Sequence, residues 1–103
     1  FMMGGLTEFN TAVRMGMDLI VIICNDAAYG AEHIQLKDKN MDPASTEFDW
    51  PSFAETAIAL GGEGVLVRSD AELTSAIEAI NKRQKPILVE LRLDPNEVPR
   101  MRK

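Results

Sequence analysis

The sequence predicts an α/β fold: a three-layer arrangement with a parallel sheet covered by helices on both faces. Two observations lead to this prediction. Segments with helical spacing of apolar residues alternate with short, continuously apolar segments, and the connections between them are mostly short. The 103 residues, 46% of them hydrophobic and 26% charged, allow one globular domain or less. We therefore treat residues 1–103 as part of a single domain.

The first predicted helix and strand occupy the first quarter of the chain. Apolar residues recur at helical spacing at Leu6, Phe9, Val13 and Met17. Residues 19–24 follow as an apolar, β-branched segment of the kind that is buried on both faces of a parallel sheet. Cys24 closes this segment, and we expect its thiol to be buried and unreactive.

Two further helices and a strand are predicted in the second half. Asp49 can cap a helix with Pro51 in its first turn, and the Gly61-Gly62 pair can end it. Residues 64–67 are predicted to form a strand. Ser69-Asp70-Ala71-Glu72 has the pattern of a capping box at the start of the next helix. The apolar residues expected to face inward from that helix are Leu73, Ala76, Ile77 and Ile80.

The last predicted strand covers residues 87–93, where an apolar run passes into alternation. Residues 94–103 begin with Asp94-Pro95-Asn96 and are expected to form an exposed C-terminal tail. Residues 37–47 are polar and irregular, and we interpret them as a mobile loop that orders over a ligand or a partner subunit.

Composition excludes several classes of function. A net charge of -5 argues against general affinity for nucleic acid or anionic lipid, which require clustered basic residues. No apolar run approaches the length of a membrane span, and the first residues lack the pattern of a signal peptide. We expect a cytoplasmic protein that binds neither nucleic acid nor membrane.

The loop after the first strand is the expected position of a ligand, because open parallel sheets bind ligands beyond the carboxyl ends of their strands. This loop reads Asn25-Asp26-Ala27-Ala28-Tyr29-Gly30. The pattern is also that of an ordinary turn, in which Asp26 would be solvated and Tyr29 would fill a gap in the packing. Gly30 is expected to relax the turn into the next segment.

The wider pattern resembles the thiamine-diphosphate enzymes of the acetolactate-synthase-like family. The resemblance rests on Phe1-Met2-Met3, the helix and strand that follow, the Asn25-Asp26 pair and then Tyr29-Gly30, and it covers nearly the whole chain. In this family a Gly-Asp-Gly triplet precedes such a segment and an Asn-Asn pair closes the motif. Here the triplet is absent and Asp26 replaces the second Asn. We therefore interpret the chain as a fragment, the C-terminal part of the cofactor-binding domain.

The resemblance implies a site for thiamine diphosphate and Mg²⁺. Asp26 would bind Mg²⁺ through its side chain and Ala28 through its backbone carbonyl, both oxygen ligands that suit this ion. Asn25 would order the loop, Tyr29 would line the cofactor, and Gly30 would complete the site. No catalytic residue is assigned, because in this family the glutamate that activates the cofactor comes from another domain.

The implied activity is that of a lyase or transferase acting on 2-keto acids by decarboxylation or carboligation, in a parent protein that forms a homodimer or homotetramer. By itself the chain is expected to be inactive. Two alternatives stay open: a non-enzymatic flavodoxin-like binding or scaffold domain, and a cofactor-bearing subunit of a split enzyme. Glu32 and His33 could suggest an acid and base pair, but we expect His33 to make a surface or partner contact.

Overall fold

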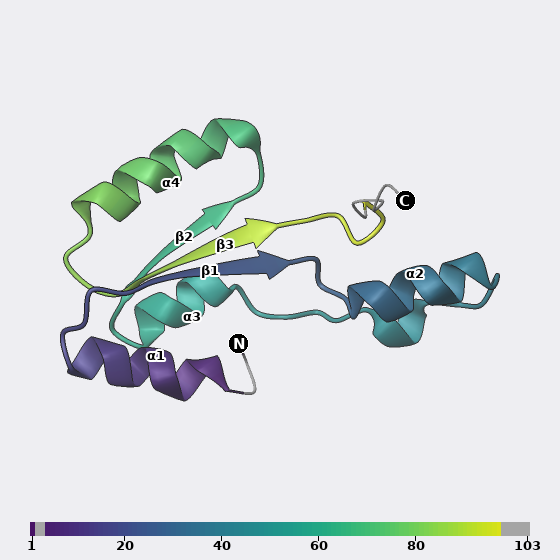
Figure 1. Cartoon of the computed structure of the whole chain (residues 1–103), viewed down its shortest axis with the longest axis horizontal. Coiled ribbons are helices and arrows are strands. Elements are labelled where there is room, and N and C mark those ends of the chain that lie inside the picture. Colours follow the sequence, from purple (N-terminus) through teal and green to yellow (C-terminus); the bar gives the residue numbers. More distant parts are fainter. Residues whose placement is uncertain (2–3, 98–103) are drawn as a thin grey trace, which may run out of the picture.

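The computed structural model describes residues 1 and 4–97, and its helices and strands alternate along the chain (Figure 1). The elements are α1 (Gly5–Arg14), β1 (Ile20–Asn25), α2 (Gly30–Asp38), the 3₁₀ helix η1 (Ala44–Thr46), α3 (Phe53–Ala59), β2 (Glu63–Val67), α4 (Asp70–Lys82) and β3 (Ile87–Arg92). The strands form one parallel sheet in the order β1-β3-β2. Within the described residues, none of the helices has the length and apolar composition needed to cross a membrane.

Helices cover both faces of the sheet, with α1 and α3 on one face and α4 on the other (Figure 1). A first cluster of buried residues lies between the sheet and α1 and α3, and contains Phe9, Phe53, Ala57 and Leu88. A second cluster lies on the side of α4 and contains Val67, Ala76 and Val89. Leu88 and Val89 are neighbours on β3 and point to opposite faces, so the central strand contributes to both clusters. The predicted three-layer α/β architecture is confirmed.

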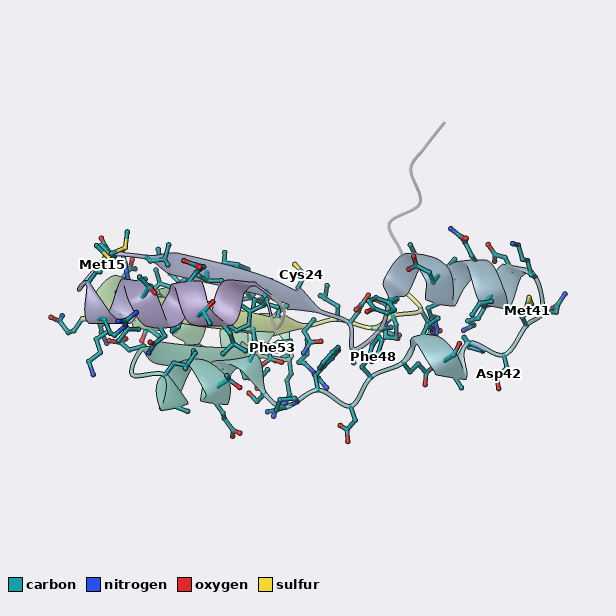
Figure 2. The ribbon with its side chains drawn as sticks, turned by 90° about the horizontal axis from the view of Figure 1, so that it is seen from below. Met15, Cys24, Met41, Asp42, Phe48 and Phe53 are labelled. Atoms are coloured by element: carbon teal, nitrogen blue, oxygen red, sulfur yellow. The ribbon has the colours of Figure 1, made fainter. Side chains whose placement is uncertain are left out.

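The edge strand β1 differs from the prediction, because only one of its faces is covered. Ile20 is 40% exposed and Ile22 is 60% exposed, whereas Val21 and Ile23 pack against the first cluster. Cys24 shares the open face and is exposed, with its side chain directed outward in Figure 2. The prediction of a buried thiol was therefore wrong. α4 packs over β2 and β3, and no described helix covers this face of β1.

Two predicted helix boundaries were wrong. Ser52, not Asp49, is the N-cap of α3, and its hydroxyl accepts a hydrogen bond from the Glu55 backbone amide at 3.2 Å. α1 ends at Arg14, so Met17 lies outside the helix and is 49% exposed. Gly16, with a φ of 62°, occupies the left-handed region shortly after the last helical turn and separates α1 from β1.

The helix α4 begins where predicted, but it faces the sheet with fewer of its apolar residues than expected. Ala76 is buried and Ile80 packs beside it, whereas Leu73 is 41% exposed and Ile77 is 56% exposed. The predicted capping box does not form. Ser69 makes no side-chain cap, and the Glu72 side chain accepts a hydrogen bond of 2.6 Å from the amide of Arg68, the residue before the N-cap.

The segment 37–47 contains more regular structure than a loop. Its first two residues belong to α2, and η1 lies near its end, with Thr46 buried. Its mobility stays a prediction. The predicted tail, residues 94–103, falls partly outside the described residues. Its first residues lie in a turn held by hydrogen bonds from Asn96 to the Asp94 carboxylate.

Candidate functional site

The loop that follows β1 lies at the carboxyl ends of the strands, where α2 begins (Figure 1). An open pocket of about 240 Å³ is present there. Four of the residues predicted for the site line it: Asn25, Asp26, Ala28 and Tyr29. The aromatic residues Phe1, Trp50 and Phe53 form much of the remaining wall. Gly30 lines a neighbouring pocket of about 520 Å³, which also includes Asp26. The structure thus brings all five predicted residues to one edge of the sheet.

The Asp26 carboxylate lies between these two pockets and is half-buried. Its Oδ1 atom accepts a hydrogen bond from the Ala28 amide at 3.1 Å. Its Oδ2 atom makes no hydrogen bond within the described residues and lies over Gly30, where an added Cβ would be only 2.5 Å away. One carboxylate oxygen therefore shapes the loop, and the other is free to bind a ligand.

The role of Gly30 differs from the prediction that it relaxes the turn. Gly30 is the first residue of α2 and is not among the residues with positive φ. Ala27 instead adopts the left-handed conformation, with a φ of 55°. The absence of a side chain at Gly30 makes room for the Asp26 carboxylate. A Cβ at this position would require the Asp26 carboxylate to shift.

Asn25 connects this loop to the central strand. Its Nδ2 atom donates a hydrogen bond of 2.7 Å to Oε1 of Glu90 on β3, and its Oδ1 atom accepts one of 3.0 Å from the Ala27 amide. Both Asn25 and Glu90 are buried, with 5% and 1% of their surfaces exposed. Asn25 therefore orders the loop through its own hydrogen bonds.

Glu90 is an important residue that sequence analysis missed. Its Oε2 atom accepts hydrogen bonds from the Ser52 hydroxyl and the Ala54 amide, each at 3.1 Å. Burial acts to raise the pKa of Glu90, but the hydrogen bonds from Asn25, Ala54 and Ser52 together outweigh it and hold the pKa below its ordinary value. A charged residue inside an otherwise apolar strand was the available signal, because a buried charge is costly without partners.

The loop is also fixed from its other side by residues 46–48. The Tyr29 amide donates to the Thr46 carbonyl, and the Phe48 amide donates to the Ala27 carbonyl, both at 2.8 Å. Ala28 and Glu47 form an isolated antiparallel bridge. Among the loop hydrogen bonds of the described residues, none uses the Ala28 carbonyl as acceptor. That oxygen is the second predicted ligand of Mg²⁺.

Tyr29 both lines the pocket and packs against other aromatic rings. Its ring meets Phe48 edge to face with a centroid distance of 4.7 Å, and Phe48 stacks on Trp50 at 4.9 Å. The Tyr29 side chain is nevertheless 55% exposed. The packing role weighed in the sequence analysis is therefore present together with an exposed surface at the pocket.

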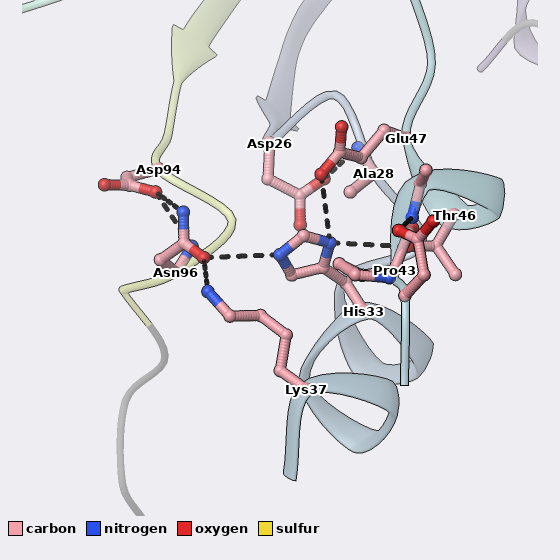
Figure 3. Close-up of polar contacts among 11 residues, drawn as sticks. Asp26, Ala28, His33, Lys37, Pro43, Thr46, Glu47, Asp94 and Asn96 are labelled. Atoms are coloured by element: carbon pink, nitrogen blue, oxygen red, sulfur yellow. Dashed lines mark hydrogen bonds and ion pairs between the residues drawn. The ribbon is translucent and has the colours of Figure 1, made fainter. Parts of the chain in front are cut away.

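His33 is buried, so the expectation of a surface or partner contact was wrong. It is 2% exposed and lies between three segments of the chain (Figure 3). Its Nδ1 atom is 3.3 Å from the Thr46 hydroxyl and 3.7 Å from a Glu47 carboxylate oxygen. Its Nε2 atom is 3.3 Å from Oδ1 of Asn96, which also accepts a hydrogen bond from Lys37. His33 thus fastens α2 to η1 and to the turn after β3.

The loop offers oxygen atoms of the kind that Mg²⁺ prefers. Asp26 offers a free carboxylate oxygen, Ala28 offers a free carbonyl, and Gly30 leaves the space that this carboxylate occupies. Within the described residues, His, Cys, Asp and Glu form no group of three that could hold a metal ion. An ion bound here would therefore complete its shell with phosphate oxygens, water or groups outside the described residues.

Comparison with known proteins identifies the family of this chain. Residues 1–91 match the family model of the thiamine pyrophosphate enzyme, C-terminal TPP binding domain. The chain is also 36% identical over 71 residues to indole-3-pyruvate decarboxylase from Azospirillum brasilense. That match covers 69% of this chain and 12% of the relative. The chain therefore belongs to the thiamine pyrophosphate enzyme family and corresponds to its C-terminal cofactor-binding domain.

Proposed function

We propose that this chain supplies part of the thiamine-diphosphate and Mg²⁺ site of an enzyme that acts on 2-keto acids. The observation that carries the proposal is the pocket beyond β1. Asn25, Asp26, Ala28 and Tyr29 line it, and one carboxylate oxygen of Asp26 is free to bind a ligand there. Family membership supports the cofactor and argues against a non-enzymatic flavodoxin-like domain. Mg²⁺ is supported by the chemistry of the two oxygen ligands.

Each residue of the loop has a defined task in this proposal. Asp26 and the Ala28 carbonyl would hold the Mg²⁺ ion, which offsets the negative charge of the diphosphate in a chain whose net charge is -5. Asn25 holds the backbone of the loop in place, and Tyr29 and Trp50 line the pocket. When bound, thiamine diphosphate supplies an electron sink for cleaving or forming the bond next to the keto carbon.

Decarboxylation is the reaction that the similarity favours, because the relative is named a decarboxylase of indole-3-pyruvate, which is a 2-keto acid. The activity would then be that of a lyase. Carboligation of the acetolactate synthase type, a transferase reaction, is the second candidate and rests on the sequence pattern around Asn25-Asp26. We further propose a cytoplasmic homodimer or homotetramer as the active form.

The test is titration of the natural full-length protein with thiamine diphosphate by isothermal titration calorimetry, with Mg²⁺ and after its removal by EDTA. We expect binding only with the metal. Asp26→Ala removes a direct ligand and should weaken binding by about 100-fold, since even changes behind the ligands typically cost 10- to 100-fold. Asp26→Asn keeps one side-chain oxygen and should bind more tightly than Asp26→Ala.

Asp49→Ala is the matched control, because Asp49 is an exposed aspartate outside both pockets. It removes the same charge and should leave the affinity unchanged. Two results would contradict the assignment of Asp26 as a metal ligand. One is equal affinity of the wild type and Asp26→Ala for thiamine diphosphate, and the other is an affinity that EDTA does not change.

A further inference from the structure

The hydrogen bonds of Glu90 all have the same direction, since a carboxylate can only accept. Oε1 accepts from Asn25, and Oε2 accepts from the Ser52 hydroxyl and the Ala54 amide. The Arg92 guanidinium lies 3.6 Å from Oε1. Glu90 is 1% exposed on the central strand, so water cannot readily replace any of these partners. The residue therefore requires a donor from each neighbour.

This requirement fixes the orientation of the Asn25 amide. Because Nδ2 must face Glu90, Oδ1 is left to accept the hydrogen bond from the Ala27 amide. A flipped Asn25 would direct its NH₂ group at the Ala27 N–H, which is also a donor. Because Glu90 can only accept, the Asn25 side chain must present its oxygen to the Ala27 amide of the loop.

The backbone at Ala27 depends on that hydrogen bond. Its φ of 55° is uncommon for a residue other than glycine and persists only where neighbouring groups hold it. Asp26 and Ala28 flank this residue, and the Asp26 carboxylate in turn accepts from the Ala28 amide. The directions of the Asp26 side chain and the Ala28 carbonyl therefore follow from the conformation of Ala27.

We propose that Glu90 is a positioning residue that sets the geometry of the Mg²⁺ and diphosphate site through Asn25 and Ala27, a role that rests on the function proposed above. Glu90 lines neither of the pockets that contain Asp26, so it acts without touching the ligand. Its effect on binding depends on the direction of its hydrogen bonds and not only on the volume that it fills.

A swap of hydrogen-bond polarity tests this role. Glu90→Gln keeps the shape of the side chain but replaces one acceptor by a donor, so it cannot serve both Asn25 and the donors of α3. Adding Asn25→Asp should restore the pattern, because Asp at 25 accepts from Gln at 90 and from the Ala27 amide. The double variant also restores the net charge.

The measured quantity is the affinity of the natural full-length protein for thiamine diphosphate at saturating Mg²⁺, by calorimetry, with the thermal unfolding midpoint measured without cofactor. Glu90→Gln should weaken binding by roughly 10- to 100-fold, the usual range for groups that orient metal ligands. The double variant should bind more tightly than Glu90→Gln, because hydrogen-bond pairing is restored. Ser52→Ala is the matched control: it removes one partner of Glu90 on the α3 side and should leave the affinity unchanged.

The outcomes separate this inference from the proposed function. If the wild type binds no thiamine diphosphate, the proposed function fails. If the wild type binds and Asp26→Ala does not, but Glu90→Gln binds like the wild type, only the positioning role is overturned. A double variant that binds no better than Glu90→Gln also overturns it. Should Glu90→Gln not fold, Asn25→Ala must show the weakened binding, and wild-type affinity in that variant would refute the role.

Discussion

Two polar junctions hold the two ends of β1, and they differ in exposure to solvent. At the carboxyl end, Asn25 bonds to the buried carboxylate of Glu90. At the amino end, Asp18 pairs with Arg83, the residue that directly follows α4, at 2.7 Å, and 79% of the Asp18 side chain is exposed. Both connect segments that are 65 positions apart in the chain.

The difference shows how burial decides what a polar contact contributes. The Asp18 carboxylate is mostly exposed, so water can take its place beside Arg83, whose side chain is 21% exposed, and the pair gains little free energy. The donors around Glu90 have no such substitute, and each must find its partner or remain unsatisfied. The buried junction can therefore fix the geometry of a site, and the exposed one cannot.

Replacing the buried Glu90 carboxylate should give the largest loss of stability. Glu90→Leu leaves the Asn25 amide group and the Ala54 N–H without an acceptor, and we expect the free energy of unfolding to fall by about 3 kcal/mol. Urea denaturation followed by circular dichroism measures this change. Glu78→Leu, on the exposed face of α4, is the control and should change stability by less than about 0.5 kcal/mol. Equal stability of the two variants would remove the contrast between the junctions.

Acid should weaken the buried junction in a second, smaller way. Although burial raises the pKa of Glu90, its hydrogen bonds hold that pKa below 4.5, so the ionised form stabilises the folded state. This contribution is complete above pH 4.5 and is lost as the pH falls through the lowered pKa of the folded state. Urea denaturation over this acidic range should show a flatter pH dependence for Glu90→Gln than for the wild type. If the free energy of unfolding changed with pH in the same way in both proteins, Glu90 would not contribute to the pH dependence of stability.

Breaking the exposed junction should give the smallest effect. Asp18→Asn removes the charge that faces Arg83, and we expect a loss of less than about 1 kcal/mol in the free energy of unfolding. The difference from the wild type should shrink further at high salt, because ions screen exposed charges. Urea denaturation at low and high ionic strength measures both values. A loss as large as that of Glu90→Leu, unchanged by salt, would contradict the comparison.

The order of helices and strands could be predicted from sequence, because it depends on local apolar spacing and on turn residues such as Gly61-Gly62. The place of the candidate pocket could also be predicted, since parallel strands end at one edge of the sheet and Asn25-Asp26 follow such a strand. Burial could be predicted less well. Leu73 and Ile77 have the same helical spacing as Ala76, yet only Ala76 lies against the sheet.

The support for the site could not be predicted, because it depends on contacts between distant segments. Glu90 lies 65 positions from Asn25 and 38 from Ser52, and no local pattern shows that these residues meet. Its position within an apolar run identified a strand and concealed a buried carboxylate. His33 was misjudged for the same reason, since its partner Asn96 lies 63 positions away.

The strand order also has a consequence for synthesis on the ribosome. Among the described residues, β3 is the last strand to be translated, yet it lies between β1 and β2, which are not paired with each other. Neither β1 nor β2 can pair with β3 until residues 87–92 have left the exit tunnel. Glu90 emerges with them, so the nascent loop around Asn25 acquires its final shape only at the close of the translation of this sheet.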